Sequence, residues 1–362
     1  MPARLRGLFN SILVQAAFVA CALAILGVMS APIKANTALY TVTDLGSLGC
    51  CRDWIWESTA LALNNAGDVV GTTTSPTDPS MTLPFIYRDG TLTAITDWTG
   101  EAKGINDAGQ VTGGATPPGE LMPHAFVYDQ NGVFTDLGAL PGYSNQPYAV
   151  GYAINGSGVV VGDSKSGAFI YDNGTMRLLK RLSARFASDV NDLGDVVGLL
   201  QTVSAGSPHA NKGFLFSDNA LIEIGTMDGD PESQTTQLRI NNRRQISGIA
   251  YNATRLDARA FLWENGVFGD LGTLRGGYSY AMDLNNHGHV VGFSDSSVFV
   301  YREGVMIDLN QAFEKNGSVW PHIQDVHAIN DRGQIVGNAY FEDSTGVVRL
   351  RACLLTPVVP VQ

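Results

Sequence analysis

Residues 105–113 read Ile-Asn-Asp-Ala-Gly-Gln-Val-Thr-Gly, and the same nine-residue pattern occurs seven times along the 362-residue chain. The seven copies cover residues 63–71, 105–113, 154–162, 190–198, 240–248, 284–292 and 329–337. Their asparagines recur about every 44 residues, and a regular period of this size is typical of repeat proteins in which each repeat is one supersecondary unit. We therefore expect seven similar structural units.

Each position of the pattern is consistent with a β-hairpin. The residue before the asparagine is always Leu, Ile or Val, as expected for a strand position that faces a core. The asparagine opens a tight turn, because its side chain can bond nearby backbone groups. The fifth position is glycine in six copies, which supplies a positive φ, and Arg244 in the other, where we expect a strained or differently shaped turn. The last position is always glycine, which indicates a bulge or a close approach of two backbones.

Two further strands are predicted after each hairpin. The third segment combines alternating apolar and aromatic residues with a terminal turn of the Asn/Asp-Gly type, as in 84–90, 168–174 and 260–266. The fourth segment, as in 133–142 and 267–277, is again rich in β-branched and apolar residues. Helical periodicity is missing after the first 35 residues. The predicted unit is therefore a sheet of four antiparallel strands.

The two ends of the chain predict a closed ring. The last repeat stops after its third strand, 351–356, whereas residues 40–49 match the fourth strand of another repeat, 267–275. A sheet completed by both chain ends closes a β-propeller and leaves only short, protected edges, whereas an open solenoid needs polar end caps. The sequence therefore predicts an all-β, seven-bladed propeller of four-stranded antiparallel blades, closed by pairing of residues 40–48 with residues 351–356.

The repeats resemble those of the HAF family of extracellular repeat proteins. The tripeptide that names this family is present as His124-Ala125-Phe126, together with elements related to Asn-Asp-x-Gly-Gln-Val-Val-Gly and Asp-Leu-Gly-Thr-Leu-Gly-Gly. The likeness covers residues 40–357, although other copies of the tripeptide begin with Arg or Gly instead of His. The resemblance implies export and a repeated β fold. It implies no particular activity and no catalytic residue.

The N-terminal segment has the layout of a secretory signal peptide. Arg4 and Arg6 precede an apolar stretch from Ile12 to Met29, and small residues follow up to Ala35. The apolar stretch is also long enough to act as an uncleaved membrane anchor, which would be the chain's one link to a membrane. We expect residues 1–35 to be a cleaved signal peptide, residues 36–362 to form a single propeller domain, and the protein to be secreted.

Composition and motifs narrow the classes of function. The formal net charge is −11, so we expect no nucleic-acid partner, because an acidic surface is repelled by phosphate. The three cysteines after the leader, Cys50, Cys51 and Cys353, do not form a disulfide framework, and alignment of the repeats predicts that Cys353 is a small core residue. Nucleotide-binding, metal-binding and nucleophile motifs are missing, so we expect no cofactor and no metal.

Two sets of residues are candidate site residues. The turns between the first and second strands are uniform, whereas the connections on the opposite face vary, and variable loops on a rigid scaffold often carry function. Aromatic residues that suit flat ligands or partner anchors, or that pack between blades, gather in the connections between blades: Trp54, Trp56, Tyr143, Tyr148, Tyr278, Tyr280 and Trp320. The second set lies in first-strand positions that other repeats fill with small residues: Asp189, Arg239, Asp283 and His327.

Three hypotheses of function remain open at this point. The first is a secreted, non-catalytic binding module for a carbohydrate or an extracellular protein, which uses the aromatic set on the variable face. The second is a glycan-active hydrolase or lyase with a site at the mouth of the central channel, which uses the second set. The third is a structural matrix component without a discrete ligand.

Overall fold

The computed structural model describes residues 39–49, 57–141, 146–179, 184–201, 211–230, 232–254, 256–313, 322–342 and 346–359. Residues Leu39–Gln362 form one compact unit. The expected signal peptide, residues 1–35, lies outside the described residues. Within the described ranges, no helix has the length and apolar character needed to cross a membrane.

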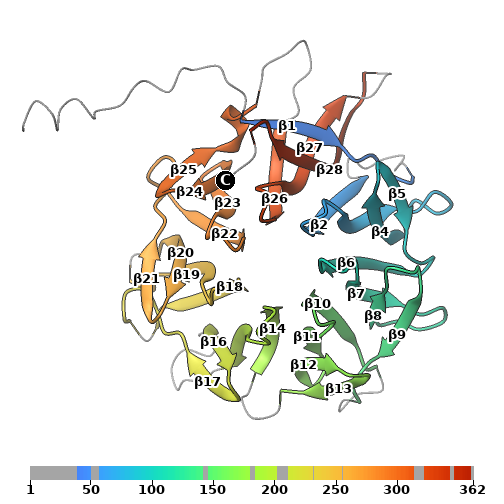
Figure 1. The fold of residues 1–362 in the computed structure, drawn as a ribbon, viewed down its shortest axis with the longest axis horizontal. Coiled ribbons are helices and arrows are strands. Elements are labelled where there is room, and N and C mark those ends of the chain that lie inside the picture. Colours follow the sequence, from blue (N-terminus) through green and yellow to red (C-terminus); the bar gives the residue numbers. More distant parts are fainter. Residues whose placement is uncertain are drawn as a thin grey trace, which may run out of the picture. The chain divides into compact units, whose positions relative to one another are not determined.

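Twenty-eight described strands form seven four-stranded antiparallel sheets, arranged as the blades of a ring (Figure 1). From the first blade to the seventh, the strands are β2 (Ser58–Leu63), β3 (Val69–Thr74), β4 (Thr82–Arg88) and β5 (Thr91–Ala94); β6 (Thr99–Ile105), β7 (Val111–Thr116), β8 (His124–Tyr128) and β9 (Phe134–Gly138); β10 (Ala149–Ile154), β11 (Val160–Ser164), β12 (Gly167–Asp172) and β13 (Thr175–Leu178); β14 (Ala184–Val190), β15 (Val196–Gln201), β16 (Asn211–Ser217) and β17 (Ala220–Glu223); β18 (Gln234–Ile240), β19 (Ile246–Tyr251), β20 (Ala258–Glu264) and β21 (Val267–Asp270); β22 (Ser279–Leu284), β23 (Val290–Ser294), β24 (Ser297–Arg302) and β25 (Val305–Asp308); and β26 (His322–Ile329), β27 (Ile335–Glu342), β28 (Val348–Pro357) and β1 (Tyr40–Asp44). One short 3₁₀ helix, η1 (Leu309–Gln311), follows β25. The predicted seven-bladed, all-β propeller is confirmed.

The seventh blade contains strands from both ends of the described chain. β1 pairs antiparallel with β28, so that Tyr40 lies opposite Pro357 and Asp44 lies opposite Cys353. Figure 1 shows the blue β1 beside the dark red β28. The regular strand is shorter than the predicted range 40–48, because the Asp44 side chain accepts a hydrogen bond from the N–H of Gly46, whose φ of 76° turns the chain.

The hydrophobic core is divided among the junctions between neighbouring blades. Between the first two blades, Val70 and Ile86 pack against Ala102, Val111 and Phe126, and all five side chains are buried. Similar clusters lie at the other junctions, including the one that joins the seventh blade to the first. Each blade therefore depends on its two neighbours for burial of its apolar faces.

The asparagine turns have the predicted form. In the first repeat, Asn64 Oδ1 accepts hydrogen bonds from the N–H groups of Ala66 (3.0 Å) and Asp68 (2.9 Å). Arg244, which replaces the turn glycine in the fifth repeat, adopts a φ of 60°, and its N–H still bonds the Asn241 carbonyl at 3.1 Å. Of the two predicted outcomes for this turn, the structure shows strain rather than a different shape.

The last glycine of the repeat lies where two elements approach closely. A Cβ atom on Gly71 would lie 1.9 Å from the Thr59 carbonyl oxygen and 3.0 Å from the Phe85 ring, and the first strand carries a bulge opposite this glycine. Six blades place a fully buried phenylalanine opposite this glycine on the third strand: Phe85, Phe126, Phe169, Phe214, Phe261 and Phe299. The prediction of a bulge or a close approach is confirmed, since both are present.

The seventh blade has Cys353 in place of this phenylalanine. Cys353 is fully buried and unpaired, as predicted for a small core residue, and burial raises the pKa of its thiol. The first strand of this blade has the larger Val326 opposite Gly337, where the first blade has Ala60 opposite Gly71. Cys50 and Cys51 lie outside the described residues.

Candidate functional site

A β-bulge in the first strand of each blade turns a side chain toward the axis of the ring. In the first blade, Leu61 is unpaired between Ala60 and Ala62, each of which has a partner on the second strand. A bulge of this kind changes the direction of one side chain relative to the regular alternation of a strand. The corresponding residues of six blades all line the central channel: Leu61, Lys103, Tyr152, Ser188, Met282 and His327.

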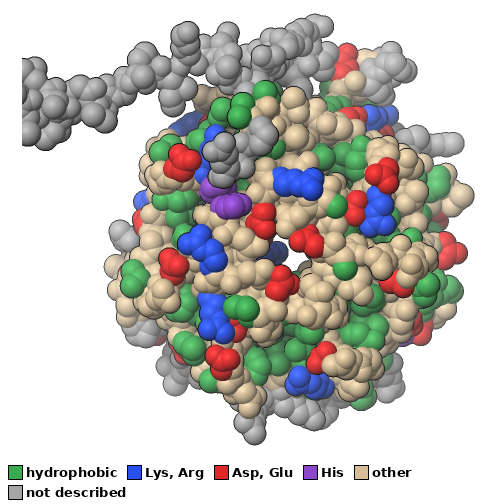
Figure 2. All heavy atoms as spheres, in the orientation of Figure 1, with side chains coloured by type: hydrophobic (Ala, Val, Ile, Leu, Met, Phe, Trp, Pro, Cys, Tyr) green, Lys and Arg blue, Asp and Glu red, His purple; other side chains and the backbone are tan. Residues whose placement is uncertain are grey.

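The channel has three consecutive sections, which share lining residues. The narrow end, a cavity of about 190 Å³, is formed by the seven asparagine turns. The waist, of about 150 Å³, shares Leu63, Ile105 and Ile154 with the narrow end. The mouth, of about 610 Å³, shares Arg239 and His327 with the waist and opens toward the variable connections between second and third strands. Figure 2 shows the opening at the narrow end, with acidic side chains around it.

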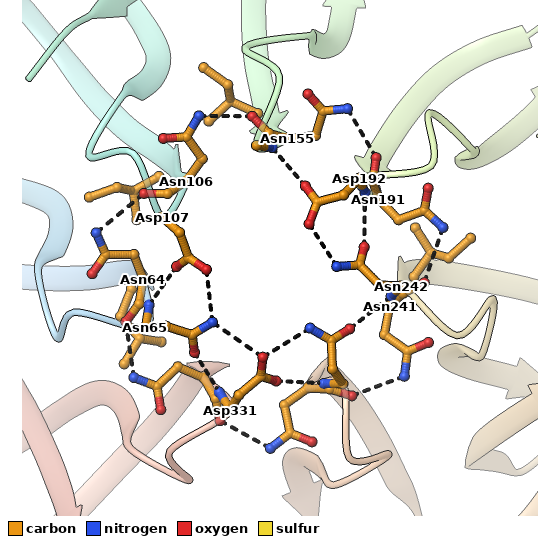
Figure 3. A pocket seen from close by; sticks show the side chains of 18 of the residues that line it. Asn64, Asn65, Asn106, Asp107, Asn155, Asn191, Asp192, Asn241, Asn242 and Asp331 are labelled. Carbon is orange, nitrogen blue, oxygen red and sulfur yellow. Dashed lines mark hydrogen bonds between the residues drawn. The ribbon is translucent and has the colours of Figure 1, made fainter.

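The narrow end contains a closed ring of asparagine hydrogen bonds (Figure 3). The side-chain Nδ2 of each repeat asparagine donates to the main-chain carbonyl of the corresponding asparagine in the next blade, at 2.8–3.2 Å. The ring passes from the seventh blade back to the first, since Asn330 donates to Asn64 at 2.9 Å. The asparagines therefore join the blades as well as shaping their own turns.

A second ring of hydrogen bonds lies beside the first and is interrupted once. Here the main-chain N–H of the residue after each asparagine donates to the side chain of the equivalent residue in the next blade, at 2.7–2.9 Å in six cases. The seventh bond, from Asp107, is missing because the next blade has Gly156 at this position. The rim carboxylates Asp107, Asp192 and Asp331 accept bonds in this ring, so their first role is to join blades.

The waist carries three charged residues on three consecutive blades. Asp189, Arg239 and Asp283 occupy equivalent positions of β14, β18 and β22, where the other four blades have Ala or Gly. Asp189 Oδ2 accepts a hydrogen bond from Ile240 N–H, and Asp283 Oδ2 accepts one from Ile329 N–H, both at 2.9 Å. Each carboxylate thus bonds the backbone of the next blade.

The two waist carboxyl groups lie deep in the molecule and reach solvent only through the channel. Burial raises the pKa of Asp189, against the effect of the neighbouring Arg239. Burial also raises the pKa of Asp283 to about 7, again opposed by Arg239 and increased slightly by the negative charge of Asp189. Among the described residues, no group of three or more His, Cys, Asp or Glu is placed to hold a metal ion.

The mouth combines aromatic faces with polar side chains. The Tyr152 and Phe186 rings meet edge to face, with centroids 4.8 Å apart, and Lys103 Nζ lies 5.7 Å from the Tyr152 centroid. Also in the lining, the Tyr251 ring centroid lies 6.4 Å from that of Tyr280. The remaining polar lining comes from amides, hydroxyls and bases: Asn211, Gln234, Thr236, Gln237, Arg239 and His327.

Gln237 makes the fifth blade different from the other six. In the fifth blade the bulge contains two residues, Gln237 and Leu238, between the paired Thr236 and Arg239. Leu238 is fully buried in the core, whereas Gln237 is exposed to the mouth and has a φ of 52°. A non-glycine residue with this backbone conformation inside a strand is strained and often belongs to a functional site.

The structure brings the second set of predicted residues together. Asp189, Arg239, Asp283 and His327 all line the waist, and His327 Nε2 lies 3.2 Å from the Asp325 carboxylate. Sequence reasoning missed other lining residues of the mouth, notably Lys103, Tyr152 and Gln237. The signal that could have found Lys103 and Tyr152 is that the bulge position differs in almost every repeat. Gln237 could have been found because the other repeats have Ala, Gly or Val in its column.

The aromatic set is only partly described. Trp54, Trp56, Tyr143 and Trp320 lie outside the described residues. The Tyr148 hydroxyl donates to Asp163 at 2.9 Å, and burial, together with this carboxylate, raises the pKa of Tyr148 to about 12. The Tyr278 ring stacks on the Tyr280 ring, with centroids 5.1 Å apart. Tyr280 in turn lies beside Tyr251 of the mouth.

No protein-family model matches the chain, and no curated protein sequence is similar to it. Among solved structures, YCF48 bound to D1 peptide is similar, with 12% sequence identity, a TM-score of 0.50, and coverage of 90% of this chain and 98% of that chain. A gluconolactonase from Xanthomonas campestris has 10% identity and a TM-score of 0.40, with coverage of 90% and 92%.

An acylaminoacyl peptidase from Pyrococcus horikoshii has 11% identity and a TM-score of 0.46 over 80% of this chain. The chain spans about half the length of that peptidase, 51%. At such low identities the likenesses concern the fold alone. The class of protein that the fold defines is a seven-bladed β-propeller with a wide mouth on its variable face.

Proposed function

We propose that this protein is a secreted carbohydrate-binding propeller of the HAF type, and that its ligand lies in the mouth of the central channel. The observation that carries this proposal is the composition of the 610 Å³ mouth cavity, whose volume lies within the range of about 300–1,000 Å³ usual for ligand pockets. Export enters the proposal through the signal-peptide pattern of residues 1–35.

The side chains of the mouth match the two surfaces of a sugar ring. A sugar ring has apolar C–H faces, which pack on aromatic rings, and the mouth offers Tyr152, Phe186 and Tyr251. Its hydroxyls both donate and accept hydrogen bonds, and amide side chains can do the same. Asn211 and Gln234 are held in place by their mutual hydrogen bond of 3.3 Å. A concave site of this kind suits a carbohydrate better than the flat surface of a protein partner.

Binding of purified protein to a panel of oligosaccharides, measured by calorimetry, tests the proposal. Tyr251→Ala should weaken binding about tenfold, because it removes one aromatic wall of the mouth. Tyr340→Ala is a matched control. The two tyrosines hold equivalent places in their blades, because each pairs with the first residue of the first strand: Tyr340 with His322 of β26, and Tyr251 with Gln234 of β18. Tyr340 does not line the mouth.

The control variant should bind as the unchanged protein does. Absence of binding to every oligosaccharide, or equal affinities for the Tyr251→Ala variant and the unchanged protein, would remove the proposal.

A hydrolase or lyase is the second candidate function, and the waist favours it. A carboxyl group with a pKa near 7, as at Asp283, suits transfer of a proton at neutral pH, and His327 and Arg239 lie in the same section. If this candidate holds, Asp283→Asn should abolish depolymerisation of a glycan while leaving its binding in the mouth unchanged. Release of reducing ends would measure the activity. Lack of activity in the unchanged protein on all glycans that it binds would exclude this candidate.

A further inference from the structure

The mouth has a different charge from the rest of the molecule. The chain carries a formal net charge of −11, yet the mouth is lined by Lys103, Arg239 and His327 and by no Asp or Glu among the described residues. Asp189 and Asp283 line the narrower waist. Glu101 and Asp325 lie beside Lys103 and His327 without lining the mouth. A basic lining in an acidic protein indicates a ligand with negative charge, because complementary charge favours binding at such a site.

Of the three basic side chains, Arg239 has the largest free hydrogen-bonding capacity. Lys103 pairs with Glu101, and His327 lies beside Asp325. A guanidinium has five N–H donors, and within the described part of the chain Arg239 uses one, from Nη1 to the Leu238 carbonyl at 3.2 Å.

The two nearby carboxylates do not use the remaining Arg239 donors. Their described hydrogen bonds come from backbone N–H groups, to Asp189 from Val190 and Ile240 and to Asp283 from Ile329. Arg239 therefore keeps donors for a ligand group, in the planar arrangement that fits a carboxylate or a sulfate.

The strained backbone of the fifth blade places a second donor beside Arg239. Other blades have Ala, Gly or Val at the position of Gln237, and those residues pair with the repeat glycine. In the fifth blade Leu238 contacts Gly248 instead, so Gln237 is released from the core and lines the mouth with Arg239. This departure carries a cost in stability that the other six blades avoid. The simplest explanation for the strained backbone at Gln237 is that it serves recognition of a ligand.

The waist carboxylates limit this attraction without cancelling it. Asp189 and Asp283 lie on the blades that flank Arg239 and line the waist with it. Burial raises the pKa of both carboxyl groups, to about 7 at Asp283, and the lower negative charge of Asp283 near neutral pH reduces its repulsion of an anionic ligand.

We infer that the mouth selects saccharides that carry an anionic group, a carboxylate or a sulfate ester, which binds Arg239 with Gln237 beside it. This inference rests on the proposed carbohydrate-binding function and names the substrate class of that site. The carboxylate of a uronic acid and the sulfate of a sulfated sugar present the same chemistry to a guanidinium, and binding measurements distinguish these two sources.

The test compares three oligosaccharides of equal length: an oligogalacturonate, a sulfated galactan fragment and a neutral galactan fragment. Calorimetry on the purified protein should show at least tenfold tighter binding of one or both acidic ligands than of the neutral one. Raising the salt concentration should weaken the acidic ligands selectively. The better of the two acidic ligands identifies the source of the anionic group.

Arg239→Gln should remove the preference for the acidic ligand and leave the weaker neutral binding in place. Arg185→Gln is the matched control, since Arg185 is exposed on β14 of the neighbouring blade and does not line the mouth. A second variant, Gln237→Gly, keeps Arg239 and relieves the strained backbone. It should raise the Tm by about 1–3 °C while weakening the acidic ligand several-fold.

The outcomes separate the two proposals. Equal binding of acidic and neutral ligands, unchanged in Arg239→Gln, would overturn the inference and leave the carbohydrate-binding function intact. Loss of the acidic preference in the Arg185→Gln control would also overturn it, because general surface charge would then explain the selectivity. Failure of all three oligosaccharides to bind the unchanged protein would count against the proposed function itself.

Discussion

At the scale of single residues, Arg244 shows how a repeat accommodates the loss of its turn glycine. Its backbone has a φ of 60°, a conformation that costs a non-glycine residue about 1–2 kcal/mol. Its side chain reaches the neighbouring blade, where Nε lies 2.8 Å from Asp195 Oδ2, and Asp195 is buried. Although burial acts in the opposite direction, the hydrogen bond from Arg244 helps to lower the pKa of Asp195. The strain is thus offset by an ion pair between blades.

We expect Arg244→Ala to lower the free energy of unfolding, since the backbone strain remains while the bonds to Asp195 are lost. Arg244→Gly should cost about 1 kcal/mol less, because glycine adopts this backbone conformation without strain. Chemical denaturation of both variants measures the difference. If the two variants lost equal stability, the turn would store no strain.

The waist carboxyl of Asp283 should make stability depend on pH. Its pKa is raised to about 7, chiefly by burial, so the folded protein binds the proton more tightly than the unfolded chain does. The free energy of unfolding should therefore fall as pH rises from about 4 to about 7, by about 3 kcal/mol.

Asp283→Asn should flatten this pH dependence, because an amide of the same shape can still accept the Ile329 N–H bond without becoming charged. Denaturation midpoints between pH 4 and pH 8 measure the effect. A variant whose stability changes with pH just as the unchanged protein's does would assign the dependence to other groups.

At the scale of the blade, a smaller core side chain on the third strand is accompanied by a larger one on the first strand. The seventh blade combines the small Cys353 with Val326, whereas the first combines Phe85 with Ala60, and in both blades the repeat glycine separates the two side chains. Close packing in protein cores makes such a combination cooperative, because a change at one position leaves a void or a clash at the other.

The two positions should therefore be coupled in stability. Val326→Ala should cost about 1–3 kcal/mol through a cavity, and Cys353→Phe a similar amount through overpacking. The double variant should be more stable than the sum of the single effects by at least about 1 kcal/mol. A double-mutant cycle measured by denaturation gives this coupling, and additive effects would show that the two side chains pack independently.

At the scale of the whole molecule, the ring is held at its narrow end by hydrogen bonds that cross every junction between blades. The junction between the seventh and first blades receives an additional bond, since Arg351 Nε of β28 donates to Glu57, which precedes β2, at 2.7 Å. Arg351 also binds Asp44 of β1, within the seventh blade, at 3.0 Å. Glu57 is 3% exposed. This junction is thus also joined by an ion pair whose carboxylate is buried.

Gly156 leaves one gap in the second ring of bonds, and filling it should stabilise the ring. Gly156→Asn supplies the acceptor that Asp107 N–H lacks, and we expect a gain of about 1 kcal/mol over Gly156→Ala, which adds no acceptor. The added Cβ would lie 2.9 Å from Asp192 Oδ1, the end of a side chain that can move. Thermal denaturation compares the two variants, and equal midpoints would show that the gap carries no cost.

Much of the fold could be predicted from the sequence, because its determinants are local. The turn asparagines, the glycines after them and the alternation of the strands act within about ten residues, so they are visible in one repeat and are verified by the other six. Asp189, Arg239 and Asp283 could also be found from the sequence, because each replaces a small residue in its column, and the structure gathers them in the waist. His327 lies in the same section, but its column is the variable bulge position and holds large residues in most other repeats.

The mouth could not be predicted in the same way. Lys103 and Tyr152 lie within strands, where simple alternation gives no reason to direct them toward the axis. A bulge interrupts the alternation, and its effect on side-chain direction depends on pairing with the second strand.

The sequence by itself determined the number of blades, the four strands of each and the form of their turns, because these follow from short-range patterns repeated seven times. The tertiary structure alone decided which further side chains meet at the axis and that one ring of hydrogen bonds passes through all seven blades while a second is interrupted once. Distances across the ring depend on how many blades pack together and on the bulges of their inner strands, and residues about 44 positions apart carry no local record of that geometry.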